Sequence, residues 1–153
     1  MKRIFALGTI LALGLLSVGT VAADDAADVK ASVEKGVTLV KERGRDEALK
    51  VIGDPNSPFV KGDLYLFAGS LDKVVLLAHP LAPQLVGTDL STFKDPKGTL
   101  FFVKFKEVAE ASGNGWVEYV SPVPGAKEGS LKKAYIMRVP GEKMYVGAAY
   151  YPK

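Results

Sequence analysis

The sequence lacks cysteine altogether and contains one histidine and one tryptophan among its 153 residues. Without cysteine, the chain cannot form disulfide bonds, a catalytic thiolate, a lipidated cysteine anchor or a cysteine-ligated metal or haem site. The one histidine has no serine or carboxylate partners at a spacing typical of nucleophilic or acid–base catalysis. We therefore expect a protein that is not an enzyme and carries no cofactor.

Long apolar runs are absent except at the N-terminus. A basic start with Lys2 and Arg3 precedes an apolar run over Ile4–Val18. The small residues Val21-Ala22-Ala23 then fit a cleavage site. This pattern predicts a secretory signal peptide over residues 1–23, cleaved after its last residue, and therefore a periplasmic protein. The alternative is that the segment is kept as a membrane anchor.

Neither sign of charge predominates in the rest of the chain. Two of the 20 basic residues lie in the predicted signal peptide, so 18 basic residues face 17 acidic ones, a net charge of +1. No basic cluster marks a nucleic-acid-binding face. We also expect no metal site, because four loop aspartates do not form a compact ligand loop: Asp54, Asp63, Asp89 and Asp95. Residues 24–153 suffice for one domain with one hydrophobic core.

A helical pattern covers the start of this domain, from Asp24 to about Ile52. Its apolar face is formed by four valines at helical spacing: Val29, Val33, Val37 and Val40. Gly44 is a predicted break, after which Asp46 would cap a second helical piece over Glu47–Ile52. The sequence therefore predicts a long helix followed by a short one.

Two segments with alternating side chains follow, and they predict strands over Asp63–Ala68 and Lys73–His79. Tyr65 and Phe67 share one face of the first strand, and the only histidine lies at the end of the second. The turn residues Gly69-Ser70 are predicted to join the two strands. We expect this hairpin to form the centre of the fold.

The rest of the chain alternates predicted loops, one helix and three strands. The loops are Leu81–Asp95, with a helical turn near Leu90–Phe93, and Ser121–Ser130; the helix is Leu100–Ala111; the strands are Trp116–Val120, Leu131–Val139 and Lys143–Tyr151. We predict an α+β fold, in which an antiparallel sheet of about five strands carries the long N-terminal helix on one face. The inserted helical segment would cover the other face and leave a pocket beneath it.

Six short motifs occur in order along the chain: Gly62-Asp63-Leu64-Tyr65-Leu66-Phe67, Leu77-Ala78-His79-Pro80, Leu85-Val86-Gly87-Thr88-Asp89-Leu90, Gly115-Trp116-Val117-Glu118-Tyr119, Lys132-Lys133-Ala134-Tyr135 and Val146-Gly147-Ala148-Ala149-Tyr150-Tyr151. Together they resemble the single Cache domains of type 2, over about residues 26–151. The resemblance implies a PAS-like antiparallel sheet with a long N-terminal helix. It also implies an extracytoplasmic sensor domain for small ligands, often short carboxylates.

Most members of that family are fused through transmembrane helices to chemoreceptors or histidine kinases. This chain ends at Lys153 without such a helix, so we expect a free-standing form that acts with a membrane-bound receptor, kinase or transporter. It departs from the family pattern at Ser121, where many members carry a second tryptophan, and in a hairpin loop that is one residue longer than usual. Both departures leave the identity of the ligand open.

A small carboxylate requires a cation or several hydrogen-bond donors, together with an apolar wall for its alkyl end. Tyrosine and tryptophan suit such a site because each combines a large apolar ring with one polar tip. The candidates are Tyr65, His79, Trp116, Tyr119 and Tyr135 as donors, Lys132 or Lys133 as the cation, and Phe67 and Met137 as the wall. Each also has a structural alternative, such as His79 bonding the backbone near Pro80.

The two adjacent lysines give conflicting indications. Strict strand alternation places Lys133 on the same face as Tyr135, whereas the spacing in the family points to Lys132. Only a bulge, or the start of the strand between these residues, would bring Lys132 and Tyr135 into one pocket. We favour Lys132 as the cation and expect Lys133 to be solvated.

Two functional hypotheses remain. The first is a periplasmic binding or sensing module that captures a small organic acid and passes its occupancy to a membrane partner. The alternative is a structural or interaction module without a small ligand, in which the N-terminal helix pairs with a partner or forms a homodimer. The four valines could serve that pairing, or they could pack on the sheet.

Overall fold

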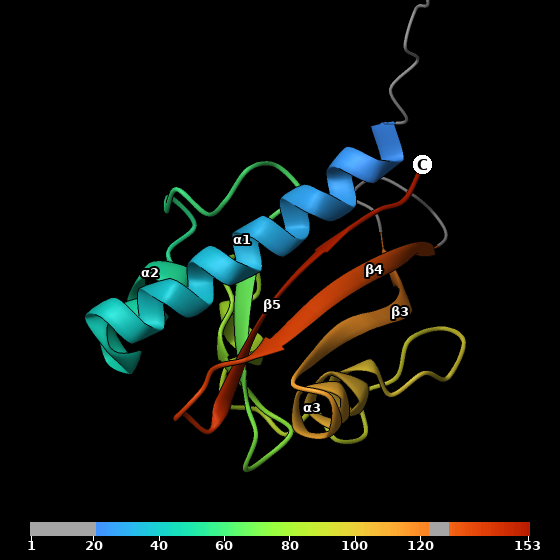
Figure 1. Ribbon diagram of the computed structural model, residues 1–153. Coiled ribbons are helices and arrows are strands. Elements are labelled where there is room, and N and C mark those ends of the chain that lie inside the picture. The colour runs from blue at the N-terminus through green and yellow to red at the C-terminus, as the bar shows by residue number, and fades with distance from the viewer. Residues whose placement is uncertain (1–20, 123–128) are drawn as a thin grey trace, which may run out of the picture.

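The computed structural model describes residues 21–122 and 129–153 (Figure 1). Its elements in chain order are α1 (Val21–Arg43), α2 (Arg45–Gly53), β1 (Leu66–Ser70), β2 (Leu76–Ala78), the 3-10 turn η1 (Pro83–Leu85), α3 (Phe101–Ala111), β3 (Asn114–Pro122), β4 (Gly129–Arg138) and β5 (Met144–Tyr150). The predicted signal peptide lies almost wholly outside the described residues, since α1 begins at Val21. No helix in the described part of the chain has the length and apolarity needed to cross a membrane.

The strands form one five-stranded antiparallel sheet in the order β2-β1-β5-β4-β3. In Figure 1, α1 and α2 lie across one face of this sheet, whereas α3 lies on the other side. The predicted α+β, PAS-like architecture is therefore confirmed, with a long N-terminal helix on one side and the inserted segment on the other. The last three strands are neighbours in space because short connections favour pairing of consecutive strands.

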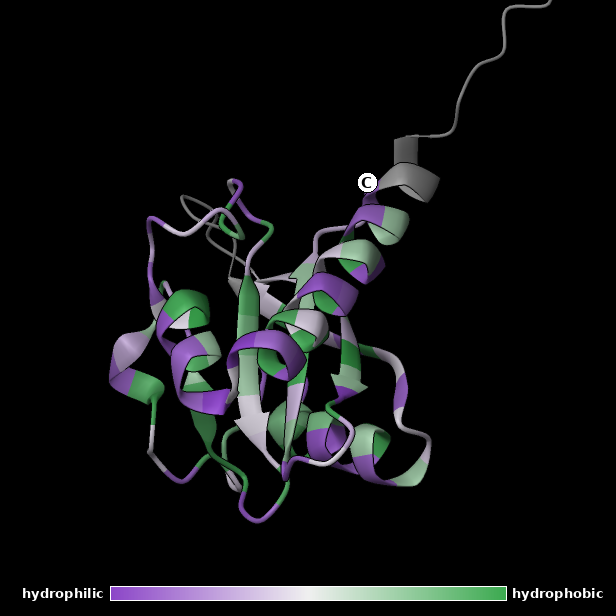
Figure 2. Cartoon of the chain, turned by 60° about the vertical axis from the view of Figure 1, so that its left-hand side comes forward, coloured by the Kyte–Doolittle hydropathy of each residue, from purple (hydrophilic) through white to green (hydrophobic). Residues whose placement is uncertain are grey.

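Helix α1 is held on the sheet by the four valines that the sequence singles out. Val29, Val33, Val37 and Val40 are all at most 5% exposed. At Gly36 a Cβ atom would lie 2.8 Å from Leu66 Cδ1 and 2.9 Å from Val146 Cγ1, so only glycine lets the helix approach β1 and β5 this closely. Figure 2 shows hydrophilic and hydrophobic segments alternating along α1, as expected of a helix with one buried face.

The two helical pieces separate at Gly44, as predicted. Its φ of 80° lies in the left-handed region that glycine adopts at little cost. The prediction that Asp46 caps the second piece is wrong, because α2 begins at Arg45 with Gly44 as its N-cap. Asp46 instead lies in the first turn, where a negative charge interacts favourably with the helix dipole.

The central hairpin is displaced from its predicted position. β1 runs over Leu66–Ser70, and the predicted turn residues Gly69 and Ser70 belong to the strand because they pair with Tyr145 and Met144 of β5. Tertiary pairing thus overrides local turn chemistry. Glycine is required here, since the ring of Tyr145 occupies the space that a side chain at position 69 would need.

A register irregularity between β1 and β2 changes which way β2 side chains point. Ala68 pairs with Ala78 and Gly69 with Leu76, so Leu77 is an extra residue on β2. The bulge puts Leu76 in the core beneath α3 and Ala78 in the core beneath α1. Strict alternation, which predicts Leu76 and Ala78 on one face, is therefore wrong at this point.

The segments that cover the second face also differ in detail from the prediction. The helical turn falls at Pro83–Leu85, whereas Leu90 and Phe93 close a single hydrogen-bonded turn, with 3.1 Å between Phe93 N and Leu90 O. Strands β3 and β4 are longer than predicted because they pair from Asn114–Met137 to Pro122–Gly129. The rest of the predicted Ser121–Ser130 loop, residues 123–128, lies outside the described residues.

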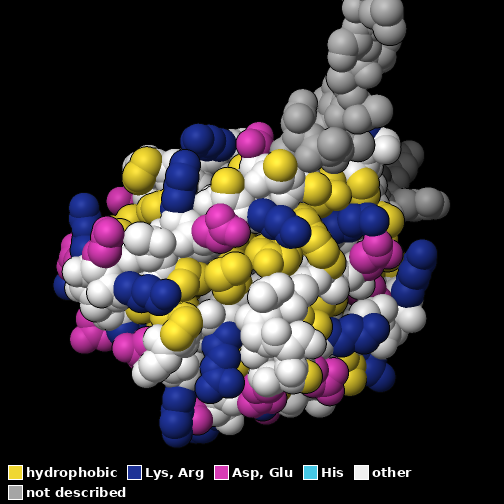
Figure 3. All heavy atoms as spheres, viewed as in Figure 1, with side chains coloured by type: hydrophobic (Ala, Val, Ile, Leu, Met, Phe, Trp, Pro, Cys, Tyr) yellow, Lys and Arg dark blue, Asp and Glu magenta, His cyan; other side chains and the backbone are white. Residues whose placement is uncertain are grey.

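The molecular surface carries no large field of one sign in the view of Figure 3. Lysine and arginine side chains are interspersed with aspartate and glutamate over the face that α1 crosses. This view shows no clustered basic footprint of the kind that a nucleic-acid-binding protein carries.

Candidate functional site

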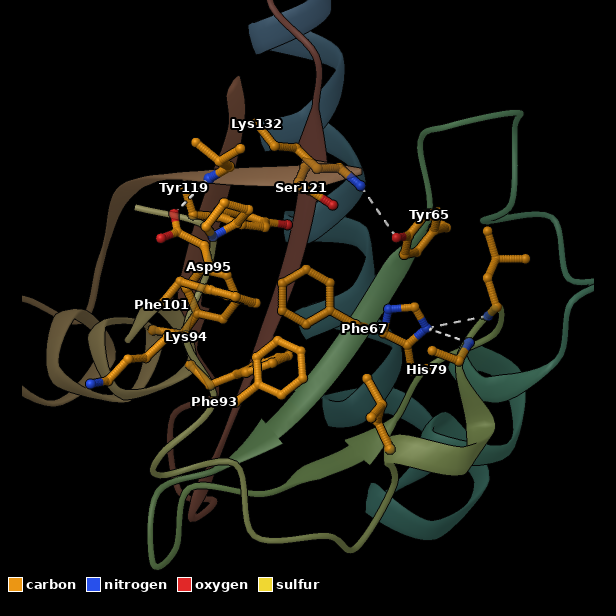
Figure 4. Close-up of a pocket in the computed structure, with 18 residues that line it drawn as sticks. Tyr65, Phe67, His79, Phe93, Lys94, Asp95, Phe101, Tyr119, Ser121 and Lys132 are labelled. Carbon is orange, nitrogen blue, oxygen red and sulfur yellow. Dashed lines mark hydrogen bonds between the residues drawn. The ribbon is translucent and has the colours of Figure 1, made fainter. Parts of the chain in front are cut away.

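A cavity of about 380 Å³ lies between the sheet and the segments that cover its second face. Five of the seven predicted site residues line it: Tyr65, Phe67, His79, Tyr119 and Lys132. Figure 4 shows these side chains converging from β1, β3, β4 and the end of the β2 segment. The sheet and its cover thus form the pocket that the order of elements predicts.

Lys132 places a buried positive charge at one end of the cavity. The residue is 4% exposed, and its Nζ donates a hydrogen bond of 3.3 Å to Tyr65 Oη. The same ammonium lies 5.0 Å from the centroid of the Tyr65 ring and 4.8 Å from that of Tyr151. Within the described residues no carboxylate forms an ion pair with Lys132. Burial lowers the pKa of Lys132, and the more distant Asp63 only partly opposes this effect.

The register of β4 explains why Lys132 and not Lys133 faces the cavity. Pairing with β3 is regular, with Tyr119 opposite Lys132 and Glu118 opposite Lys133. Lys133 points to the other face, where its Nζ lies 2.7 Å from Glu118 Oε1. This ion pair raises the pKa of Lys133. Lys132 is therefore the only one of the two lysines that can reach a ligand in the cavity.

Trp116 and Tyr135, the other two predicted site residues, lie on the opposite face of the sheet. They face each other across β3 and β4, with 5.1 Å between ring centroids. Tyr135 is packed in the core beneath α1, with Met137 against the same core, and the Nζ of Lys30 lies 5.3 Å from its ring centroid. The prediction that Trp116 and Tyr135 share the pocket is wrong, because β4 has no bulge between residues 132 and 135.

His79 combines the structural and the ligand-facing roles that the sequence left open. Its Nδ1 accepts hydrogen bonds from the backbone N–H groups of Ala82 at 2.9 Å and Leu81 at 3.2 Å. Because Nδ1 is an acceptor, the neutral ring carries its hydrogen on Nε2, and this nitrogen points toward the cavity (Figure 4). Burial, with a smaller effect from Lys132, lowers the pKa of His79 to about 4. His79 is therefore a neutral donor at neutral pH.

The two tyrosines of the cavity are also neutral groups. Burial raises the pKa of Tyr65 to about 12, with smaller effects from Tyr151 and Asp63. Burial likewise raises the pKa of Tyr119, whose ring stacks on Phe101 with 4.3 Å between centroids and an interplanar angle of 13°. The polar end of the cavity thus offers one cation and neutral donors.

Asp95 lines the cavity as well, although the sequence suggested no role for it there. Its Oδ1 accepts hydrogen bonds from the backbone N–H of Thr99 at 2.7 Å and Lys97 at 2.9 Å, and its Oδ2 accepts one from Val120 at 2.8 Å. Burial raises the pKa of Asp95, but these backbone donors outweigh it and hold the pKa below its ordinary value. The carboxylate therefore joins the covering loop to β3 and has its charge satisfied by the protein.

Sequence reasoning also missed the aromatic end of the cavity. Besides Phe67, four phenylalanines line the cavity: Phe93, Phe101, Phe102 and Phe105. The sequence predicted the helix over Leu100–Ala111, but not that its N-terminus forms a cavity wall. No cluster of three or more His, Asp or Glu side chains that could hold a metal ion occurs among the described residues.

Comparisons with known proteins agree with this architecture. The family model dCache_2, a Cache domain, matches residues 28–153. A solved periplasmic sensor domain of a chemotaxis protein has a TM-score of 0.74 at 28% identity, covering 87% of this chain and 99% of that one. A Cache chemosensory domain that recognises carboxylic acids has a TM-score of 0.72 at 24% identity, covering 86% of this chain and 95% of that one.

A curated relative is the methyl-accepting chemotaxis protein McpP of Pseudomonas putida strain KT2440, which is 29% identical over 119 residues. The aligned part is 78% of this chain but only 21% of the relative, so the chain spans about a fifth of that chemoreceptor. The family match covers most of the sequence, and the fold agrees with it. The chain therefore belongs to the Cache domain family.

Proposed function

We propose that this chain is a periplasmic binding domain for small organic acids, which passes its occupancy to a membrane-bound signalling partner. The observation that carries the proposal is the ammonium of Lys132, buried in the cavity without an ion pair among the described residues. Burying an unpaired charge is unfavourable, and a carboxylate in the cavity would supply the missing counter-charge.

The groups around Lys132 favour an anion over a cation. Tyr65 Oη accepts a hydrogen bond from Lys132 and retains its own O–H as a donor, and His79 Nε2–H is a second neutral donor. Charge-assisted hydrogen bonds from these groups would satisfy both oxygens of a carboxylate. The carboxylate of Asp95, in contrast, is already bonded to three backbone N–H groups and does not require a cationic ligand.

The proposed partner follows from the relatives, which include a chemoreceptor and a periplasmic sensor domain of a chemotaxis protein. We infer a membrane-bound receptor, histidine kinase or transporter as the protein that reads the bound state. The alternative interaction module has less support, because the valines of α1 that would pair with a second helix are packed against the sheet instead. A homodimer through α1 would need a different face of that helix.

A thermal-shift screen of the purified protein tests the proposal. The panel contains carboxylates of two to four carbons, amino acids and amines. A ligand that binds only the folded state stabilises it and so raises the melting temperature. At a ligand concentration one hundred times the dissociation constant, the free energy of unfolding rises by about 2.7 kcal/mol. We expect at least one carboxylate to do so, and Lys132→Met to abolish the shift.

The matched control is Lys133→Met, which changes the neighbouring lysine on the opposite face and should leave the shift intact. A screen in which only amines stabilise the protein would contradict the proposal. So would a carboxylate whose effect survives Lys132→Met.

A further inference from the structure

The cavity is large in comparison with a short acid. A cavity of about 150 Å³ lined by apolar side chains is enough to hold a benzene ring. The cavity described here measures about 380 Å³. A ligand of two to four carbons would leave most of this space to water lying against apolar walls, which is unfavourable.

The wall away from Lys132 is made of aromatic rings that contact one another. Phe101 and Phe102 have centroids 4.3 Å apart, and Phe93 meets Phe101 edge-on at 5.7 Å and 90°. Phe93 also meets Phe102 at 5.5 Å and 72°. Rings in such edge and offset arrangements can contact a further ring with a face or an edge. Each aromatic pair of this kind contributes favourable free energy beyond that of burying its apolar area.

Phe93 is the exposed member of this wall. Phe93 is 43% exposed although it lines the cavity, whereas Phe101 and Phe102 are each 8% exposed. An apolar ring bound beside Phe93 would remove part of this surface from water, which is favourable in proportion to the area covered. The rim of the cavity is therefore suited to an apolar ligand group.

The charged groups around the cavity limit the ligand to one carboxylate. Lys132 supplies the buried cation at one end. Lys94 also lines the cavity, but its ammonium points away from it (Figure 4). Asp95 is a carboxylate, and a second ligand carboxylate would meet either this like charge or the phenylalanine wall.

We infer that the cavity takes an aromatic monocarboxylate, with the carboxylate at Lys132 and the ring against Phe93, Phe101 and Phe102. This inference rests on the proposed function, because it keeps Lys132 as the anion-binding group. It goes further by assigning the ligand class from the volume and the aromatic wall. Phe93 is then a specificity-determining residue for the ring.

Isothermal titration calorimetry of the full chain tests the inference with three probes. These are phenylacetate, propionate and benzamide, which carry the ring with the charge, the charge without the ring, and the ring without the charge. We expect phenylacetate to bind at least tenfold more tightly than propionate, and benzamide to bind more weakly than phenylacetate by a similar factor. A dicarboxylate probe, phenylsuccinate, should bind at least tenfold more weakly than phenylacetate.

Two surface aromatic variants then separate the ring site from general stability. Phe93→Ala should weaken phenylacetate binding at least fivefold and change propionate binding less than twofold. Trp116→Ala is the matched control, because Trp116 is 37% exposed but lies on the opposite face. It should change neither affinity.

The outcomes distinguish a failure of the aromatic ligand class from a failure of the proposed organic-acid function. If propionate binds through Lys132 and phenylacetate binds no better, the aromatic class is wrong while the organic-acid function stands. If phenylacetate binds best but Phe93→Ala weakens both acids equally, the placement of the ring is wrong. If neither acid binds, the proposed function fails together with the inference.

Discussion

The two faces of the sheet differ in the kind of side chain that packs on them. Beneath α1 the core consists mainly of aliphatic side chains, and Gly36 lets the helix approach β1 and β5 closely. On the other face the cover consists of a loop, a short 3-10 turn and α3, whose phenylalanine rings meet small sheet residues such as Ala134 and Ala149. Large rigid rings above short side chains leave a cavity, so one face serves mainly stability and the other holds the candidate binding site.

Strand β4 shows this division within a single element. Lys132, Ala134 and Ile136 face the cavity side, whereas Tyr135 and Met137 face α1. Successive residues of a strand point to opposite faces, so neighbouring positions in the sequence serve different purposes. Substitutions at neighbouring positions can therefore test the contrast between the faces.

The largest expected effect is a loss of stability on the α1 side. Leu66 is fully buried against α1, so Leu66→Ala should lower the free energy of unfolding by about 3–4 kcal/mol through lost burial and a residual cavity. The neighbouring Phe67→Leu, on the cavity side, should lower it by less than about 1.5 kcal/mol, because adjoining space already exists. Urea unfolding measures both values. Equal losses would show that the two faces do not differ in packing.

The next effect is a dependence of stability on pH that belongs to the cavity side. The pKa of His79 is lowered from 6.5 to about 4, so the folded state binds the proton less well than the unfolded state. The contribution of neutral His79 to the free energy of unfolding should be fully present above pH 6.5. It should fall as the pH drops toward 4, by at most about 3 kcal/mol. His79→Asn keeps an acceptor for the N–H groups of Leu81 and Ala82 but cannot be protonated.

Urea unfolding of the wild type and of His79→Asn at several pH values between 7 and 4 checks this expectation. The variant should show a flatter profile across this range. Asp95, whose pKa is lowered from 3.8, contributes stability that is lost only at still lower pH, so it does not obscure the comparison. Parallel profiles for the two proteins would contradict the assignment to His79.

The smallest expected effect on stability comes from the lysine pair. Lys132→Met removes a buried ammonium that has no ion pair within residues 21–122 and 129–153, and it keeps a similar volume, so the melting temperature should stay the same or rise by about 3 °C. Lys133→Met breaks a partly exposed ion pair with Glu118 and should change the melting temperature hardly at all. Differential scanning calorimetry compares them. A marked loss of stability in Lys132→Met would mean that the ammonium stabilises the folded state, which would contradict its assignment as an anion-binding group without a counter-charge.

Much of the fold could be predicted because its signals are local. The valine spacing defined the buried face of α1, and Gly44 marked its end. The exact extent of β1 could not be predicted. Gly69 and Ser70 are turn residues by local preference, and they join the strand only because β5 pairs with them.

The candidate site was predicted in part, for a comparable reason. Alternation along the predicted strand Asp63–Ala68 grouped Tyr65 with Phe67, and the structure places both side chains in the cavity. Tyr135 was misplaced because the family spacing was weighed against the register of β4, and the regular pairing with β3 decides that register. Trp116, chosen for its polar tip, lies opposite Tyr135 and therefore on the same, wrong face. Whether the five cavity residues bind a ligand stays a prediction for the experiments above.

Local sequence was sufficient to specify the order of helices and strands, the buried side of α1 and the alternating pattern of the strands, because each depends on residues close together in the chain. The cavity has a different origin. Lys132, Tyr65, His79 and the phenylalanines of the 93–105 segment come together only when β1, β4 and the cover pack on each other. Their mutual distances depend on strand pairing and on the room left between rigid rings and small side chains, and no local pattern encodes that.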